Sequence, residues 1–301
     1  MAKDIFNFYA VALIDMLGQS IELERFTVLP KDETENKEFL IVARATVGRV
    51  RRFRKSIRQF NQLLSRPISV PATVQANWPP EAYQLFKKYR QPEIRIGFFS
   101  DLAIISVSLL DNPYHSPLFS IHGLLHELSL LLLTQMASGV MIRGAIDVGI
   151  CSEIEKGELY GQGLSRAYSL EAERADYPRI VLGPHFLQYL ESYSRSDVSP
   201  PEKVIQESYL NLIGQCIELD QGSYILSYLC ELIKHSYSEE PHAFEEVVKH
   251  CCRFIKGEIE RCGRNDDQKL GRRAYKVKEY FQTHKCWIET NEVGDSPVTE
   301  K

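Results

Sequence analysis

The sequence lacks the patterns that mark secreted, zinc-ribbon and membrane-spanning proteins. No basic segment followed by an apolar one opens the chain, so we expect no signal peptide. The seven cysteines form no C-x-x-C pair, which argues against a zinc ribbon, and their odd number indicates reduced thiols. The longest apolar stretch, residues 118–137, contains two histidines, a glutamate and a glutamine, so it predicts a buried helix. These absences favour a cytoplasmic protein without a membrane segment.

Several enzyme signatures are absent as well. The chain has no nucleophile elbow, P-loop or G-x-G-x-x-G fingerprint, which argues against serine hydrolases, P-loop nucleotidases and dinucleotide-binding enzymes. His122 and His126 are four residues apart, but Gly123 stands where the H-E-x-x-H motif of zinc proteases requires glutamate. We interpret both histidines as polar positions on the buried helix. The formal net charge of -4 gives no overall attraction to nucleic acid or to anionic lipid.

What the chain does have is the composition of a folded protein, with 301 residues of which 44% are hydrophobic and 25% charged. Apolar strand-like runs alternate with segments of helical composition, which predicts a sheet covered by helices. We expect strands at 6–14, 93–99, 102–109, 140–150 and 178–182, and a hairpin within 216–229 that turns at Gln221-Gly222. We expect helices at 38–64, 81–89, 116–138, 164–175, 184–193 and from 241 onward. Loops and turns are expected at 30–37, 65–80, 158–163 and 194–201.

Two acids stand out because neither lies where packing favours a carboxylate. Asp15 ends a buried strand just before Gly18, and Asp101 lies at the tip of the hairpin between 93–99 and 102–109. If the first strand lies beside the hairpin, both carboxylates point at one spot. Two carboxylates plus substrate phosphates suit Mg²⁺, and two such ions serve in-line phosphoryl transfer. The alternative is that both are ordinary turn residues, since Asp stabilises turns.

The order of short motifs around these acids resembles a known family. FYAVALIDMLGQ, IRIGFFSDLAIIS, VMIRGAIDVG and ELYGQGLSRAYSLEAERADYPRIVL resemble successive segments of class III nucleotidyl cyclases. The FSD hairpin, the RGAI strand, the G-x-G-L-x-x-A-Y-x-L-E helix, the PRI strand and a late D-x-G-x-Y-I hairpin are most similar to the pyrimidine cyclases of bacterial Pycsar antiphage systems. The resemblance covers about residues 6–229.

The resemblance implies an α+β fold, a ferredoxin-like βαββαβ class III cyclase sheet with helices on one face. Residues 1–230 would form the cyclase-like domain and residues 231–301 a C-terminal helical extension. Two subunits would form a head-to-tail homodimer that shares its active sites. A separate cyclic-nucleotide effector would act downstream, as expected of a cytoplasmic second-messenger synthase in antiphage defence.

The resemblance also implies a reaction. Asp15 and Asp101 would hold two Mg²⁺ or Mn²⁺ ions, and CTP or UTP would be closed to a 3′,5′-cyclic nucleotide with release of pyrophosphate. The backbone of the loop after the first strand would lie against the phosphates, as amide-rich turns do. That loop comprises Met16, Leu17, Gly18 and Gln19.

The helix after the Gly-led turn departs from the family pattern. Ser165 and Ser169 stand where many class III cyclases have an asparagine that orients the ribose and an arginine that stabilises the transition state. Arg166 or Arg174 on the same helix, or Arg143 on the preceding strand, are the candidates to replace that arginine. The alternative for the two helix arginines is a solvated face.

The sequence only partly indicates which nucleobase the substrate would carry. Gly97 occupies the position of the adenine-reading lysine of adenylyl cyclases, and Glu158 falls where those enzymes place a base-contacting acid. A carboxylate would accept a hydrogen bond from the cytosine amine, whereas uracil needs a donor such as Arg95 or Tyr9. An exposed turn acid is the alternative for Glu158. The choice between cytosine and uracil stays open.

Residues 44–58 are strongly basic, and their apolar positions have helical spacing. We favour an electrostatic role near the triphosphate, with a solvated helix as the alternative. Two other functions stay open. One is a catalytically inactive nucleotide sensor or interaction module, indicated by Ser165 and Ser169. The other, weaker one is an RNA-binding protein that uses Arg51 and Arg52.

Overall fold

The computed structural model describes residues 6–18, 26, 28, 30–64, 72–89, 94–110, 116–155, 158–237, 240–265 and 268–288. In these ranges the strands are β1 (Asn7–Met16), β2 (Ile94–Phe99), β3 (Leu102–Ser108), β4 (Ile142–Glu155), β5 (Glu158–Gly161), β6 (Ile180–Leu182), β7 (Ile217–Asp220) and β8 (Ser223–Leu226). The helices are α2 (Glu33–Leu64), α3 (Ala72–Gln75), α4 (Pro80–Phe86), α5 (Pro117–Ala137), α6 (Gln162–Arg174), α7 (Pro184–Ser194), α8 (Pro200–Gln215), α9 (Glu231–His235), α10 (Pro241–Asn265) and α11 (Gln268–Thr283). The α+β class expected from the sequence is confirmed.

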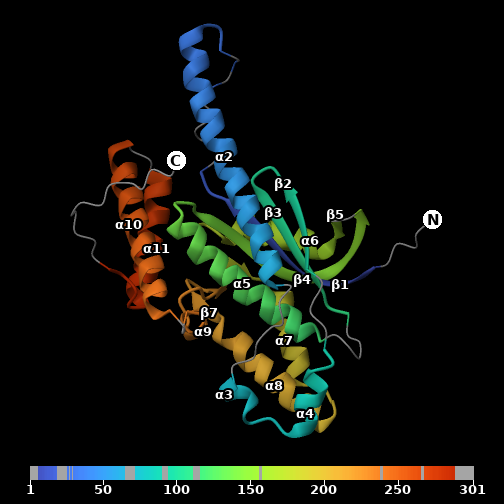
Figure 1. Ribbon diagram of the computed structural model, residues 1–301. Coiled ribbons are helices and arrows are strands. Elements are labelled where there is room, and N and C mark those ends of the chain that lie inside the picture. The colour runs from blue at the N-terminus through green and yellow to red at the C-terminus, as the bar shows by residue number, and fades with distance from the viewer. Residues whose placement is uncertain are drawn as a thin grey trace.

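All of the strands belong to one sheet with the order β2-β3-β1-β4-β6-β8-β7, and β5 pairs with β4 (Figure 1). Every pair is antiparallel except β4 with β6. β1 lies between β3 and β4, as its uninterrupted apolar sequence predicts for a central strand. The elements from β1 to β4 follow the order strand, helices, strand, strand, helix, strand. This arrangement positions the end of β1 next to the β2–β3 hairpin tip.

Helices cover both faces of the sheet, so the expectation of helices on one face is wrong. Ala10, Ala12 and Ile14 of β1 belong to the main core, together with residues of α2 and α5. Tyr9 and Val11 point the opposite way and pack against α6. Small residues allow α6 to approach that closely: a Cβ atom added to Gly149 of β4 would lie 2.5 Å from the backbone nitrogen of Gly163 in α6.

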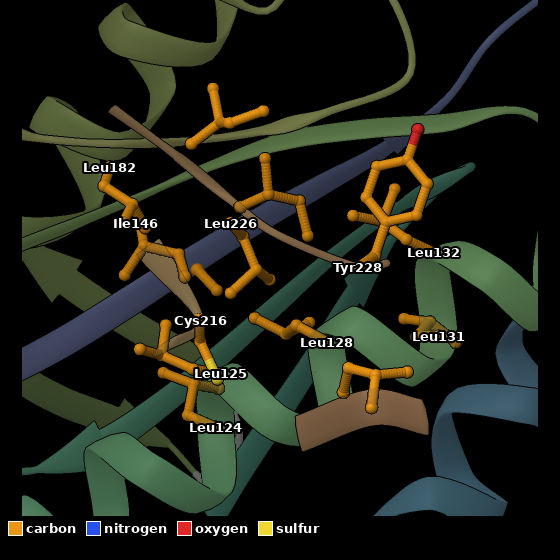
Figure 2. Close-up of a cluster of buried hydrophobic side chains, with 14 of the residues drawn as sticks. Leu124, Leu125, Leu128, Leu131, Leu132, Ile146, Leu182, Cys216, Leu226 and Tyr228 are labelled. Atoms are coloured by element: carbon orange, nitrogen blue, oxygen red, sulfur yellow. The ribbon is translucent and has the colours of Figure 1, made fainter. Parts of the chain in front are cut away.

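The main core forms where α5 crosses the sheet. Figure 2 shows leucines of this helix facing Ile146 of β4, Leu182 of β6 and Leu226 of β8. Of the described helices, α5 alone is long and apolar enough to cross a membrane, but 78% of its most apolar window is buried. The predicted buried helix is therefore confirmed.

Several predicted boundaries are wrong. The helix expected from residue 38 begins at Glu33, inside the predicted loop 30–37. Residues 158–161, expected as a turn, form β5, because β4 continues to Glu155 and gives them a partner. The predicted loop 194–201 ends where α8 begins at Pro200. The irregular connection predicted for 65–80 contains α3, while residues 65–71 lie outside the described part of the chain. The late hairpin is confirmed.

The chain after β8 is helical as far as it is described. α10 packs against α5 and α11, and Figure 1 shows the α10–α11 pair beside the end of the sheet from which α5 leads into β4. A separate apolar cluster joins Cys262, Leu270 and Ala274 of this pair to Leu17 and Met141. The C-terminal helical pair α10–α11 therefore packs directly beside the loop that follows β1.

Candidate functional site

Asp15 and Arg143 are directly opposite each other on β1 and β4. The Arg143 Nε and Nη2 atoms each lie 3.4 Å from Asp15 Oδ2, and Nη1 donates to the carbonyl oxygen of Ala175 at 3.0 Å. The same guanidinium has a second carboxylate beside it, because Nε lies 2.7 Å from Glu171 Oε1 of α6. That contact is an ion pair without hydrogen-bond alignment. One arginine thus lies between two carboxylates.

Asp101 approaches the same place from the other neighbour of β1. Its chain neighbour Leu102 is paired with Asp15, so the hairpin tip lies at the end of β1 that carries Asp15. The two acids are close enough for the charge of Asp101 to raise the pKa of Asp15. The structure therefore has both acids at the same end of the sheet.

Burial dominates the electrostatics of this site. Desolvation raises the pKa of Asp15, the positive charge of Arg143 lowers it, and Asp101 raises it again, with a net shift upward. Desolvation likewise raises the pKa of Glu171, against the opposing charge of Arg143. A partly desolvated carboxylate beside other acids costs free energy to keep ionised, unless a cation binds to it. Perturbed acids that converge in this way mark candidate functional sites.

The hairpin tip is fastened to the basic helix α2. Ser100 has a φ of 54°, and its carbonyl oxygen accepts hydrogen bonds from Arg54 Nε at 3.1 Å and Nη2 at 2.5 Å. Arg54 and Arg58 also lie over the ring of Phe98, 5.3 and 5.1 Å from its centroid. Two arginines of the basic stretch are therefore held beside the tip that carries Asp101.

The basic stretch is only partly packed as its spacing predicts. Phe53 and Ile57 are buried, whereas Val47 is 46% exposed. Figure 1 shows the reason, since the N-terminal half of α2 extends well beyond the sheet. The helix therefore combines a part that is buried beside the hairpin with an N-terminal half whose described side chains are mostly exposed.

The loop after β1 offers fewer free amides than the phosphate-loop prediction requires. Met16 is paired with Ile142 in the sheet, and the Leu17 amide donates to the Met141 carbonyl oxygen at 2.9 Å. Gly18 follows with a φ of +82°, a conformation that favours glycine. Gln19 lies outside the described residues.

The remaining predicted residues lie away from Asp15. Ser165 is exposed on α6, and Arg166 Nη1 donates to the Val148 carbonyl oxygen at 2.9 Å. Glu158 is exposed and pairs with Glu155, at the far end of β4 from Arg143.

A second polar cluster lies near that far end, where Arg95 contacts Glu153 and donates to Tyr9 Oη at 3.1 Å. Along β1, Tyr9 is six residues from Asp15, or about 20 Å at the usual strand rise. The predicted base-contacting residues and the two acids therefore lie at opposite ends of one sheet.

The structure adds residues that the sequence did not single out. Glu171 completes the ion pair around Arg143. A second group forms at Asp176, where Lys276 Nζ lies 2.5 Å from Oδ2, Arg179 Nη2 lies 3.0 Å from Oδ1, and Arg273 Nε donates to the carbonyl oxygen at 2.9 Å. Burial raises the pKa of Asp176, but Lys276 and Arg179 lower it by more, so the net shift is downward. Lys276 and Arg273 come from α11, so the C-terminal helical pair contributes to this corner.

Two further observations bound the site. Within the described ranges no three His, Cys, Asp or Glu side chains are clustered as a ready-made metal cage. A cavity of about 670 Å³ contains none of the acids discussed above, being lined by α3, α8, α9 and α10. The acids beside Arg143 therefore lie outside this cavity.

Comparisons of the chain with protein-family models, with curated proteins and with solved structures give no match.

Proposed function

We propose that the chain is a metal-dependent nucleotidyl cyclase that converts a pyrimidine nucleoside triphosphate, CTP or UTP, into a 3′,5′-cyclic nucleotide and pyrophosphate. The observation that carries the proposal is the convergence of Asp15 and Asp101 at one end of the sheet, beside Arg143. Each acid lies where the resemblance to class III cyclases expects a metal ligand. The strand order β2-β3-β1-β4, with helices between β1 and β2 and between β3 and β4, also supports a ferredoxin-like core.

The residues present fit the divalent cations of such an enzyme. Mg²⁺ and Mn²⁺ prefer carboxylate oxygens and leave positions for substrate phosphates. Asp15 is partly desolvated, and the charge of a cation would offset the cost of keeping it ionised. Asp15 and Asp101 would hold two ions, whose chemistry when bound is to neutralise triphosphate charge and to favour ionisation of the 3′-hydroxyl group.

The side chains around the acids then have separate tasks. Arg143 orients Asp15 and presents positive charge where negative charge grows on the phosphate oxygens. The bond between O3′ and the α-phosphorus forms while the bond to the pyrophosphate oxygen breaks, and the hydroxyl proton passes to water. Glu171 adds a second carboxylate beside Arg143 Nε and helps to hold the guanidinium in place.

The layout of a single chain favours a shared site. The two acids and the base-contacting candidates Arg95, Tyr9 and Glu158 are too far apart to contact one nucleotide. A head-to-tail homodimer would bring the acids of one subunit to the far end of the other. Phe99 near the acids and Tyr168 on α6 are 77% and 60% exposed, and such apolar side chains are suited to burial in that interface. By the same resemblance, the cyclic product would act on a separate effector in antiphage defence.

A second candidate is a nucleotide sensor without turnover. The observation that favours it is the exposed pair Ser165 and Ser169 on α6, whose hydroxyl groups cannot supply the charge of the expected arginine. It predicts nucleotide binding with no product.

The test is incubation with ATP, GTP, CTP and UTP in turn, each with Mn²⁺, and identification of products by mass. We expect cyclic CMP or cyclic UMP from the wild type, loss of product in Asp101→Asn, and wild-type activity in Asp197→Asn, a matched change at an exposed acid. Light scattering and circular dichroism establish that each protein is dimeric and folded. No cyclic product from any nucleotide, with the protein folded and dimeric, overturns the proposal.

A further inference from the structure

The C-terminal helical pair α10–α11 brings one arginine to the edge of the candidate site. Arg273 of α11 is half-buried, and its Nε atom donates to the Asp176 carbonyl oxygen at 2.9 Å. Its Nη1 and Nη2 atoms make no hydrogen bond to any residue that the structure describes. The helix is held in place because Leu270 and Ala274, on either side of Arg273, pack with Leu17 and Met141. Among the described residues the guanidinium is thus anchored through one nitrogen, and its other two nitrogens have no hydrogen-bond partner.

Arg273 belongs to the charge balance of the site. Asp15 and Asp176 attract it, Arg143 repels it, and its own charge in turn favours the ionised form of Glu171. Burial is the main reason that the pKa of Arg273 is lowered, followed by the charge of Arg143. Arg143 and Arg273 lie among the carboxylates of Asp15, Asp101 and Glu171. Asp176 is already paired with Lys276 and Arg179. Once cations occupy Asp15 and Asp101, the two arginines exceed the one remaining carboxylate in charge and suit a polyphosphate anion.

Two basic neighbours on α11 differ from Arg273 in their contacts and exposure. Lys276 is engaged by Asp176 Oδ2 and by Gln221 Oε1, the latter at 3.0 Å. Arg272 is exposed and precedes Arg273 directly. Arg273 differs from both because it is partly buried at the site and has two nitrogens without a hydrogen bond to any described residue.

We propose that Arg273 contacts the triphosphate of the bound nucleotide, so that the C-terminal helical pair completes the site formed by β1, β3 and β4. The planar guanidinium would offer its two free nitrogens to phosphate oxygens, a pairing for which arginine is well suited. It would place on α11 part of the positive charge that Ser169 does not supply on α6. The identity of the ligand, a nucleoside triphosphate, rests on the proposed function.

The experiment measures equilibrium binding of CTP, UTP and inorganic pyrophosphate, each with Mn²⁺, to the full chain by calorimetry. Arg273→Gln keeps a donor for the Asp176 carbonyl oxygen but loses the positive charge and the paired N–H donors of the guanidinium. We expect its affinity for pyrophosphate and for the preferred nucleotide to fall about tenfold or more. Arg272→Gln, the same change one residue earlier, should bind within about twofold of the wild type. Thermal unfolding shows whether each variant is folded.

Wild-type affinity in a folded Arg273→Gln variant overturns the inference, and so does a wild type that binds none of the three ligands. Should Arg273→Gln not fold, Arg273→Lys removes the paired donors while keeping the charge. Weaker binding by that variant supports the inference, and unchanged binding overturns it. If binding depends on Arg273 but no cyclic product forms, the proposed cyclase activity is wrong and the inferred Arg273 contact is still supported.

Discussion

Arg143 and Asp15 form an ion pair across β1 and β4 in which both contacting nitrogens are 3.4 Å from the same carboxylate oxygen. The pairing is long for a charge-assisted hydrogen bond. Desolvation outweighs it, since the pKa of Asp15 is raised overall. An ionised carboxylate that is desolvated and only weakly paired contributes little to the stability of the fold. Residues of this kind are often retained for function.

Asp15→Asn should therefore separate stability from function. Because the folded-state pKa of Asp15 is raised, its ionised form lowers stability at neutral pH, and removing the charge should not reduce the free energy of unfolding by more than about 0.5 kcal/mol. Addition of Mn²⁺ should raise the melting temperature of the wild type but not of the variant. Urea unfolding at pH 7 and thermal scans with and without Mn²⁺ check both points. An equal Mn²⁺ shift in the two proteins would contradict the assignment of Asp15 as a ligand.

Gly149→Ala should loosen α6 from the sheet. The added Cβ atom would lie 2.5 Å from the Gly163 nitrogen, a contact that only backbone movement can relieve. We expect a loss of about 1–3 kcal/mol in urea unfolding, the range for overpacking a close contact. Gly257→Ala in α10 is the matched control: its Cβ atom meets nothing within 4 Å, so stability should rise by about 1 kcal/mol. Equal stability of Gly149→Ala and the wild type would show that α6 is not closely seated.

His122 should make the fold sensitive to acid. Burial, helped by the charge of His126, lowers the pKa of His122 from 6.5 to about 3. Below about pH 6 the unfolded chain binds a proton that the folded chain does not, so this histidine's contribution to stability is present above pH 6.5 and is lost as the pH falls. Between pH 7 and pH 5 the loss should be about 2 kcal/mol.

The check is urea unfolding at those two pH values for the wild type, His122→Phe and His242→Asn. Phenylalanine should retain the packing beside Tyr209 and remove about 2 kcal/mol of the pH dependence. His242 is exposed, so its replacement should leave the dependence as it is. The same pH dependence in His122→Phe would mean that another group is responsible.

Tyr209→Phe should be neutral or stabilising. The Tyr209 ring stacks on Phe119 at 4.1 Å and stands edge-on to His122 at 5.5 Å, contacts that a phenylalanine ring can keep. The hydroxyl oxygen is buried and makes no hydrogen bond to any described residue, and burial raises its pKa. Removing an unsatisfied hydroxyl should raise the free energy of unfolding by up to about 1 kcal/mol. A loss of more than about 1 kcal/mol would instead reveal a buried water bonded to the hydroxyl.

The parts of the fold that the sequence predicts well are those set by local chemistry. Asp15 and Asp101 lie at the same end of the sheet because β1 carries an acid near its end and the neighbouring hairpin carries one at its tip. The Gln221-Gly222 turn has φ values of 48° and 76°, the left-handed pair that a two-residue hairpin needs and that glycine tolerates. The predicted loop 194–201 overlaps the start of α8, because Pro200 and Pro201 suggest a loop whereas proline also favours the first turn of a helix.

The parts that it predicts poorly depend on distant segments. A local signal for Glu171 exists, since Gly163, Ala167 and Glu171 recur every fourth residue along the buried side of α6. An acid in that row indicates a buried partner. Arg273 has no such signal, because its place is decided by the packing of α11 against Leu17 and Met141. Nothing near Arg273 in sequence distinguishes it from Arg272.

The contact of Leu17 with Leu270 and Ala274 also bears on how the protein is made. β1 leaves the ribosome long before α11 is translated, by about 10–50 s at usual elongation rates. Until then Leu17 and Met141 lack their apolar cover, and the corner around Asp15 lacks Arg273. A nascent chain, or one cut short by premature termination, would carry both acids without the helix that completes their surroundings.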